Sequence, residues 1–142
     1  MQHWVKRMDI FSREKRSEIM SRIHSRDTKP ERYAKAALWA NGFRFARSFY
    51  GLPGKPDIIL PKHRTLVFVQ GCFWHGHHCP KASLPTSNRE FWSSKITQNK
   101  KRDLRIIRSL RRQGWHCFQV WQCRLSTDVQ RVVTQLRRIR GY

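Results

Sequence analysis

The chain has 142 residues, enough for one domain with a buried core. It carries 30 Lys and Arg against 9 Asp and Glu, a formal net charge of +21. A charge this unbalanced opposes compaction unless a polyanion neutralises it, so nucleic acid is favoured as the partner over a solvated basic surface without one.

Membrane association is disfavoured because the basic residues are spread along the chain rather than gathered on one amphipathic helix. No apolar run approaches the roughly 20 residues of a membrane span. The first residues lack the apolar core of a signal peptide. We therefore expect a cytoplasmic location, where the 4 cysteines are thiols or metal ligands rather than disulfides.

The N-terminal residues 1–11 read as a loose basic arm, followed by a helix from Ser12 to about Ile23. Its apolar stripe is thin, with Ile19, Met20 and Ile23 as its members. Two interpretations stay open at this point. The stripe either packs on the protein or presents Met20 and Ile23 to DNA.

A capping box at Thr28-Lys29-Pro30-Glu31 predicts a second helix, which runs to Asn41 and stops at Gly42. Glu31 has a sufficient structural role there as the capping carboxylate, so any catalytic role is additional. The predicted buried side of this helix consists of Tyr33, Ala34, Ala37, Leu38 and Ala40.

The remaining elements alternate between strands and helices. Strands are predicted at 43–49, 57–60 and 65–69, a long helix follows Asn88 over about 89–112, and residues 115–121 read as a central strand. Ser126 or Thr127 caps a last helix whose apolar positions are Val129, Val132, Val133, Leu136 and Ile139. This order predicts an α/β fold, a three-layer α/β/α sandwich with a central mixed sheet.

A possible metal site lies directly after the third strand. Cys72, His77 and Cys79 come close together, and Cys123 follows the strand at 115–121. Such a soft ligand set suits tetrahedral zinc, and four protein ligands would make the ion structural. The spacing is not that of a standard zinc finger, so separate buried thiols and surface histidines remain the alternative. Cys117 lies within a strand and is predicted to be a core residue.

Asp57 is a candidate metal-binding carboxylate. It opens a strand after the turn Pro53-Gly54-Lys55-Pro56 and faces a second strand about ten residues on. Many Mg²⁺ nucleases use such a carboxylate, because Mg²⁺ prefers oxygen ligands and keeps waters that can attack a phosphate. The alternative is an ordinary turn residue.

Several motifs together resemble the very short patch repair (Vsr) DNA mismatch endonucleases, over about Asp9 to Leu125. They are LPGKPDIIL, VFVQGCFWHGHHC, EFWSSKI, the Arg102-Asp103 pair and GW…VWQC. The resemblance implies a PD-(D/E)xK-type nuclease fold over residues 1–142, with 1–25 as a DNA-contacting arm. It also implies nicking of one strand beside a T:G mismatch left by deamination of 5-methylcytosine.

The resemblance further implies roles for single residues. Asp57 and the backbone carbonyl of Val69 would contact Mg²⁺, and His75 would be the catalytic histidine. Glu31 and Asp103 match acidic active-site residues. The structural zinc ligands would be Cys72, His77, Cys79 and Cys123. The residues entering the DNA stack would be Phe73 and Trp74, with Met20 and Ile23 from the opposite groove. An exposed Phe-Trp pair suits stacking on bases at a mismatch, although core packing is the simpler alternative.

Gln70 departs from the family pattern, which has Thr-His where this chain has Val69-Gln70. An amide does not titrate, so Gln70 could only orient water or a phosphate oxygen. The leading hypothesis is a Mg²⁺-dependent mismatch endonuclease, expected to be monomeric and nucleoid-associated in bacteria, with other mismatch-repair proteins as further partners. The alternatives are a related nicking nuclease with another target, and a zinc-stabilised DNA-binding protein that has weakened or lost cleavage.

Overall fold

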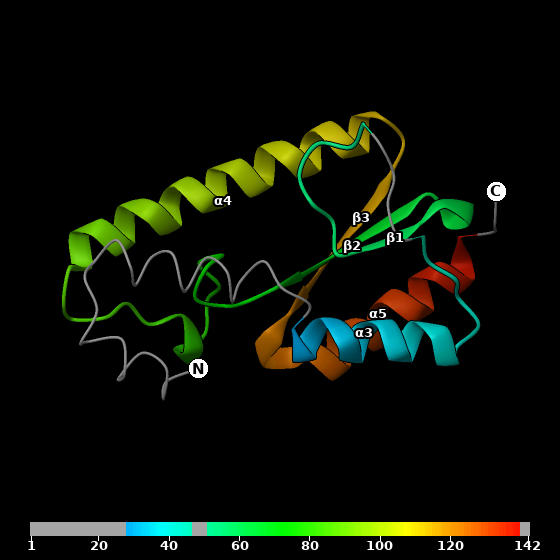
Figure 1. The fold of residues 1–142 in the computed structure, drawn as a ribbon, viewed down its shortest axis with the longest axis horizontal. Helices are drawn as coiled ribbons and strands as arrows, with labels where there is room; N and C mark the ends of the chain where they lie inside the picture. The colour runs from blue at the N-terminus through cyan, green and yellow to red at the C-terminus, as the bar shows by residue number, and fades with distance from the viewer. Residues whose placement is uncertain (1–27, 47–50, 140–142) are drawn as a thin grey trace.

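The computed structural model describes residues 28–46 and 51–139, which form a mixed α/β arrangement (Figure 1). Its helices and strands are α3 (Lys29–Ala40), β1 (Ile58–Leu60), β2 (Thr65–Gln70), α4 (Arg89–Arg112), β3 (His116–Trp121) and α5 (Leu125–Arg138). Three short 3-10 helices connect them: η2 (Pro61–His63), η3 (Pro80–Ala82) and η4 (Gln122–Arg124). The predicted helix from Ser12 to Ile23, with Met20 and Ile23, lies outside the described residues. Over the two described ranges, no helix is both long and apolar enough to cross a membrane.

The sheet is mixed, as predicted. Strand β2 pairs antiparallel with β1, with Ile58 opposite Val67, and parallel with β3, with Val69 opposite Val120. The predicted strand at 43–49 is reduced, within its described part, to a single bridge between Ala46 and Ile59. Residues 47–50 lie outside the description.

Strand β3 is at an edge of this sheet, so the prediction of a central strand at 115–121 is wrong for the part of the chain described. Backbone carbonyls on the outer edge of β3 accept hydrogen bonds from side chains instead of from another strand. Arg111 Nη2 donates to the Cys117 carbonyl at 3.2 Å, and Arg131 Nη2 donates to the Gln119 carbonyl at 3.3 Å. Helices on both faces account for the apolar sequence that suggested a central position.

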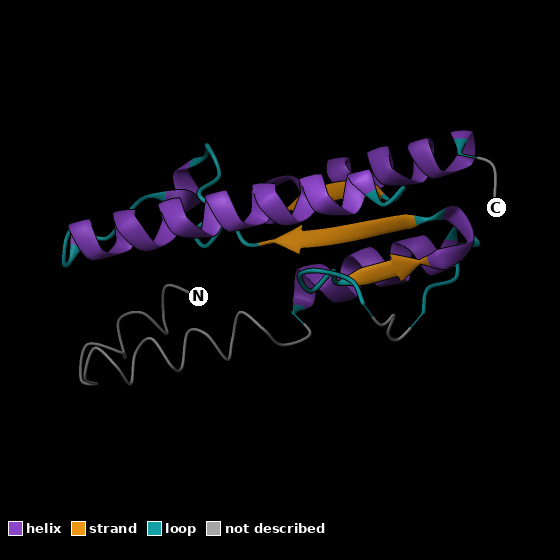
Figure 2. Cartoon of the chain, turned by 90° about the horizontal axis from the view of Figure 1, so that it is seen from above, coloured by secondary structure: helices purple, strands orange, loops and turns teal. Residues whose placement is uncertain are grey.

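Helices cover both faces of the sheet, with α4 on one side and α3 and α5 on the other (Figure 1), and Figure 2 looks onto the α4 side. One face packs on α3 and α5 through a core that includes Ile58, Val67 and Val120. The other packs on α4 through a core that includes Leu66 and Phe68. Cys117 belongs to this second core and is buried, which confirms its predicted structural role.

The sequence signals predict the start of α3 correctly, but α5 begins at Leu125, so the prediction that Ser126 or Thr127 caps it is wrong. The Thr28 hydroxyl accepts a hydrogen bond from the Glu31 N–H at 3.4 Å, as the capping box predicts. Only Ala34 and Leu38 of α3 are buried, and Tyr33 is 46% exposed, so the predicted buried side was too wide. In α5 four of the five predicted positions are buried: Val129, Val132, Val133 and Leu136.

Arg64 joins the end of α4 to the start of β2. Its Nη2 donates to the Gln113 carbonyl at 3.0 Å and its Nε to the Gly114 carbonyl at 3.5 Å. These carbonyls follow the last turn of α4, where a cation also interacts favourably with the helix dipole. Arg64 therefore serves as a remote cap for the longest helix.

We predict that Arg64→Ala lowers the free energy of unfolding by about 1 kcal/mol, because the last carbonyls of α4 lose their charged donor. Arg108→Ala, an equal loss of charge on the exposed side of the same helix, is the control and should change stability little. Denaturant titration of both variants measures the difference. Equal stability of the two would contradict the capping role.

Candidate metal cluster and nuclease site

The segment after β2 folds back on itself through a compact turn. The His75 N–H donates to the Gly71 carbonyl at 3.2 Å, and the His77 N–H donates to the Cys72 carbonyl at 3.0 Å. Asn99 of α4 donates from Nδ2 to the Trp74 carbonyl at 3.0 Å, which ties the turn to that helix. This backbone arrangement places ligand-type and aromatic side chains at the end of β2.

Four predicted ligands come together at this turn. The ligand atoms of Cys72, His77, Cys79 and Cys123 all lie within 4.8 Å of one another, and Cys123 Sγ is 3.3 Å from His77 Nδ1. Thiolates about 2.3 Å from a tetrahedral ion lie roughly 4 Å apart, so this spacing fits a single metal ion. Cys123 arrives from η4, directly after β3. The cluster therefore joins the ends of two parallel strands.

The electrostatics of the cluster follow from its burial. Burial raises the pKa of the Cys72 thiol to about 12, with Cys79 and Cys123 adding to the rise. Burial also lowers the pKa of His77, helped by the nearby Arg124 and His78. A neutral imidazole is the form that binds a metal, whereas the thiols must release protons on binding. Three thiols and one imidazole form a soft donor set.

Asp57 lies just before β1 and contacts two other predicted residues. Its Oδ2 accepts a hydrogen bond from the Val69 N–H at 2.7 Å, and its carboxyl group also hydrogen-bonds with that of Glu31 from the first turn of α3. Burial raises the pKa of Asp57, while Glu31, the Val69 N–H and the charges of His75 and Lys35 partly oppose this rise. Two carboxyl groups in contact retain a proton or attract a cation. The pair therefore fits a hard divalent ion.

His75 pairs with Asp103 across from the acidic pair. His75 Nδ1 lies 2.5 Å from Asp103 Oδ2, and both side chains are largely buried. Arg102 Nη2 is 3.6 Å from the other carboxylate oxygen of Asp103. A carboxylate on one ring nitrogen sets the orientation of an imidazole. The structure thus brings together two of the predicted site residues, His75 and Asp103.

Gln70 is 4% exposed and its side chain contacts Gln119 of β3. Gln119 Nε2 donates to Gln70 Oε1 at 3.1 Å. Sequence reasoning missed Gln119, because nothing in the sequence revealed that β2 and β3 are neighbours. The parallel register alone brings these two amides, 49 positions apart, into contact.

The aromatic pair Phe73–Trp74 is less accessible than expected. Trp74 is 7% exposed and Phe73 is half-buried, so the expectation of an exposed pair is wrong for Trp74. Both rings pack against Trp92 of α4, with centroid distances of 5.4 Å from Phe73 and 5.8 Å from Trp74. Sequence reasoning missed this contact with Trp92. Insertion of these rings into DNA would require this cluster to open.

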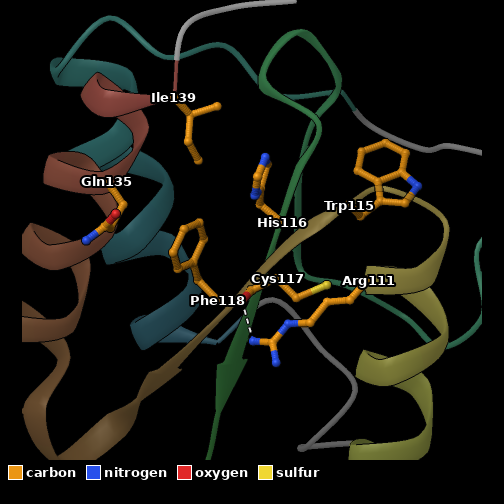
Figure 3. Close-up of a pocket in the computed structure, with 7 residues that line it drawn as sticks. All are labelled: Arg111, Trp115, His116, Cys117, Phe118, Gln135 and Ile139. Carbon is orange, nitrogen blue, oxygen red and sulfur yellow. Dashed lines mark hydrogen bonds between the residues drawn. The ribbon is translucent and has the colours of Figure 1, made fainter.

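A hollow lies away from these groups, at the other end of β3 (Figure 3). It measures about 410 Å³ and is lined by Arg111, Trp115, His116, Cys117, Phe118, Gln135 and Ile139. The Arg111 side chain crosses it to reach the Cys117 carbonyl. None of the predicted site residues lines it. The candidate chemistry is therefore concentrated at the ends of β2 and β3 that carry Gln70 and Cys123.

Comparison with known proteins gives consistent matches. The family model described as DNA mismatch endonuclease Vsr matches residues 8–81. The chain is 45% identical to the type II nicking enzyme V.NmeAIP of Neisseria meningitidis serogroup A, over 83% of this chain and 84% of that protein. It is 42% identical to the type II nicking enzyme V.XorIIP of Xanthomonas oryzae pv. oryzae, over 92% of this chain and 96% of that protein. It is 38% identical to the DNA mismatch endonuclease Vsr of Escherichia coli K12, over 82% of this chain and 75% of that protein.

Gly76 provides a test of how tightly the turn must sit on α4. A Cβ added at Gly76 would lie 2.6 Å from Lys100 Cδ and 2.8 Å from Ile96 Cγ2, and its φ is +62°. We predict that Gly76→Ala loses more stability than the about 1 kcal/mol expected for an unfavourable φ alone, and releases its metal faster. Thermal unfolding and metal transfer to a chelator measure both effects.

Gly42→Ala is the matched control, because Gly42 has a φ of +89° and nothing within 4 Å of the added carbon. It should show the backbone cost without faster metal release. If the two variants lose stability equally and retain metal equally, the turn is not packed as described.

Proposed function

The chain belongs to the family of Vsr DNA mismatch endonucleases and is a DNA endonuclease, and from that premise we propose that it nicks one strand of duplex DNA beside a T:G mismatch. The reaction would serve very short patch repair of deaminated 5-methylcytosine. The observation that carries the proposal is the contact of Asp57 with Val69 and Glu31, with the charge of His75 acting on the same carboxyl group.

Mg²⁺ is the proposed catalytic ion, held by the Asp57 carboxylate and the Val69 carbonyl. The Val69 N–H already points to Asp57, and the N–H and C=O of one strand residue face the same neighbour, which supports this assignment. When bound, Mg²⁺ would polarise the phosphate and lower the pKa of a coordinated water. The carboxylate of Glu31 would lie beside the ion as a further oxygen ligand.

His75 would transfer a proton or stabilise charge at the reacting phosphate through its Nε2, since Nδ1 is paired with Asp103. Asp103 would orient the ring. Gln70 would donate a hydrogen bond to a phosphate oxygen or to water, because its Oε1 accepts from Gln119 and its own NH₂ group is a donor. These roles need no proton exchange by Gln70.

Zinc is the proposed ion of the Cys72, His77, Cys79 and Cys123 cluster. Three thiols and one imidazole complete a tetrahedral shell, which suits a structural rather than a catalytic ion. The cluster would hold His75 and the aromatic pair in place. Its formation would contribute to folding itself.

DNA binding would combine contacts of basic residues with phosphates and insertion of aromatic rings between bases. The net charge of +21 suits phosphate contacts along a duplex. We assign Phe73 and Trp74 to insertion at the mismatch, with Met20 and Ile23 entering from the opposite groove. Insertion would cost the energy of opening the Trp92 cluster and the energy of unstacking the DNA. The second cost is smaller at a mismatch than at a paired site. This would itself favour mismatched DNA.

The proposal extends to the setting of the protein. We assign the fold to the three-layer, PD-(D/E)xK restriction-endonuclease-like class, as one domain over residues 1–142 with residues 1–25 on DNA. A monomer suits a single nick at an asymmetric mismatch. Chromosomal DNA as substrate implies a cytoplasmic, nucleoid-associated bacterial protein, with other mismatch-repair proteins as partners.

The second candidate function is that of a related nicking nuclease with another target, because two of the similar proteins carry the name type II nicking enzyme rather than mismatch endonuclease. Another mismatch, a junction or a restriction-type site would then replace T:G. A different class, a DNA-binding protein with lost cleavage, would follow if Gln70 cannot replace a histidine.

We predict that Asp57→Asn abolishes nicking while duplex binding persists, and that it stabilises the metal-free protein at neutral pH. Burial raises the pKa of Asp57 above its ordinary value of 3.8, so its contribution to stability is present below that value and is lost as the pH rises through the raised pKa. Asparagine does not ionise, so the variant avoids the loss of stability that comes from ionising a buried carboxyl group at neutral pH. Gel-based nicking, duplex binding and thermal unfolding in chelator measure the three effects.

Glu90→Gln, which removes an exposed carboxylate at the start of α4, is the control and should nick at the wild-type rate. A wild-type protein that binds T:G duplex but never nicks it with Mg²⁺ would support the binding-protein alternative. Nicking by Asp57→Asn at the wild-type rate would rule out Asp57 as the metal carboxylate.

We predict that Gln70→His raises the nicking rate at neutral pH by at least about tenfold, because a positioned imidazole can exchange a proton and an amide cannot. The measurement is the single-turnover rate on T:G duplex with saturating Mg²⁺. Gln113→His makes the same chemical change at the exposed end of α4 and should leave the rate unchanged. A Gln70→His variant no faster than wild type would show that Gln70 does not limit turnover.

A further inference from the structure

Trp121, the last residue of β3, contacts two histidines with different proposed roles. Its ring stacks on His77, with centroids 4.1 Å apart and planes 16° from parallel. It meets His75 edge-on, with centroids 6.4 Å apart and planes at 75°. His77 belongs to the metal cluster and His75 to the nuclease site. One indole thus touches both parts of the candidate site.

The backbone of Trp121 is fixed by Asp128 from the first turn of α5. Asp128 is 2% exposed, and its Oδ2 accepts a hydrogen bond from the Trp121 N–H at 2.9 Å. Arg124 Nε and Arg131 Nη2 lie 3.2 Å and 3.6 Å from its Oδ1 and compensate the buried charge. The N–H on the outer edge of β3 therefore bonds to a carboxylate that has its own counter-ions. This arrangement also spans η4, which carries Cys123.

The surroundings of Trp121 differ from those of an ordinary core tryptophan. Trp115, directly before the first residue of β3, is buried among aliphatic and aromatic side chains of the α4 core. Trp121 is half-buried and packs on imidazoles instead. Stacking restricts rotation of the His77 ring, whose Nδ1 lies 3.3 Å from Cys123 Sγ. Only Gly76 separates His77 from His75 along the chain.

We propose that Trp121 is a positioning residue that couples the metal cluster to the nuclease site, holding the rings of His77 and His75 in fixed relation. Asp128 sets the position of Trp121 through the Trp121 N–H. The effect on His75 rests on the proposed nicking function. The effect on the metal cluster does not depend on it, so the two can fail separately.

The test uses the full chain loaded with zinc, as wild type, Trp121→Leu, Trp121→Phe and Trp115→Leu. Two quantities are measured: the rate of zinc transfer to a chromogenic chelator, and the single-turnover nicking rate at saturating T:G duplex and Mg²⁺. The affinity for the duplex is measured beside them. Trp115→Leu is the matched control, since it removes the same side chain from the position directly before β3.

Trp121→Leu should release zinc about tenfold faster and nick about tenfold more slowly, with little change in duplex affinity. Trp121→Phe keeps an aromatic face and should give intermediate values for both rates. Trp115→Leu should lower the temperature of unfolding while its zinc release and saturating nicking rate stay at wild-type values.

Wild-type zinc release and nicking in Trp121→Leu would overturn the proposal, and so would equal losses in Trp115→Leu. If Trp121→Leu does not fold, Trp121→Phe decides, and wild-type rates in that variant overturn the proposal. If the wild type does not nick T:G duplex, the proposed function fails, and zinc release alone then decides whether Trp121 holds the cluster.

Discussion

The proximity of Cys123 to the turn that carries Cys72, His77 and Cys79 is the constraint on which the rest of the site depends. Residues 71–88 contain a single short 3-10 helix, η3, and no strand. The backbone hydrogen bonds within this stretch join residues close in sequence, so its attachment to the rest of the fold depends on side chains. The four ligands attach it to the end of β3, and Asn99 and Asp103 attach it to α4. A metal ion in the cluster would make the first of these attachments the strongest.

The acidic half of the site differs from the cysteine and histidine cluster, because its two adjacent carboxyl groups lower the stability of the fold when no cation is bound. Asp57 and Glu31 are in contact in a chain with only 9 carboxylate residues and a net charge of +21. Burial raises the pKa of Asp57 although Lys35 and His75 lie close enough to oppose it. A cation would stabilise such a pair, and perturbed pKa values of this kind are common at functional sites. The sheet supplies the rigidity that keeps the two carboxyl groups together.

Local signals in the sequence predicted much of this structure. The Thr28 cap, the apolar spacing of α5 and the clustering of the four predicted ligands could be read from the sequence, because each depends on residues close in sequence or on strong ligand chemistry. The features that were missed depend on pairing between distant residues. The edge position of β3, the Gln70–Gln119 contact and the stacking of Trp121 on His77 all follow from the parallel pairing of β2 with β3. Burial of Trp74 follows from where α4 places Trp92.

Nicking of mismatched DNA, which we propose for the site formed by this turn and the acidic pair, is tested most directly by one assay. Duplexes of one sequence, carrying each mismatch in turn or none, are incubated with the full chain and Mg²⁺, and each strand is followed by its own label. The account predicts a single nick in one strand of the T:G duplex and none in the fully paired duplex. Cleavage of all duplexes alike, or of none, would contradict it.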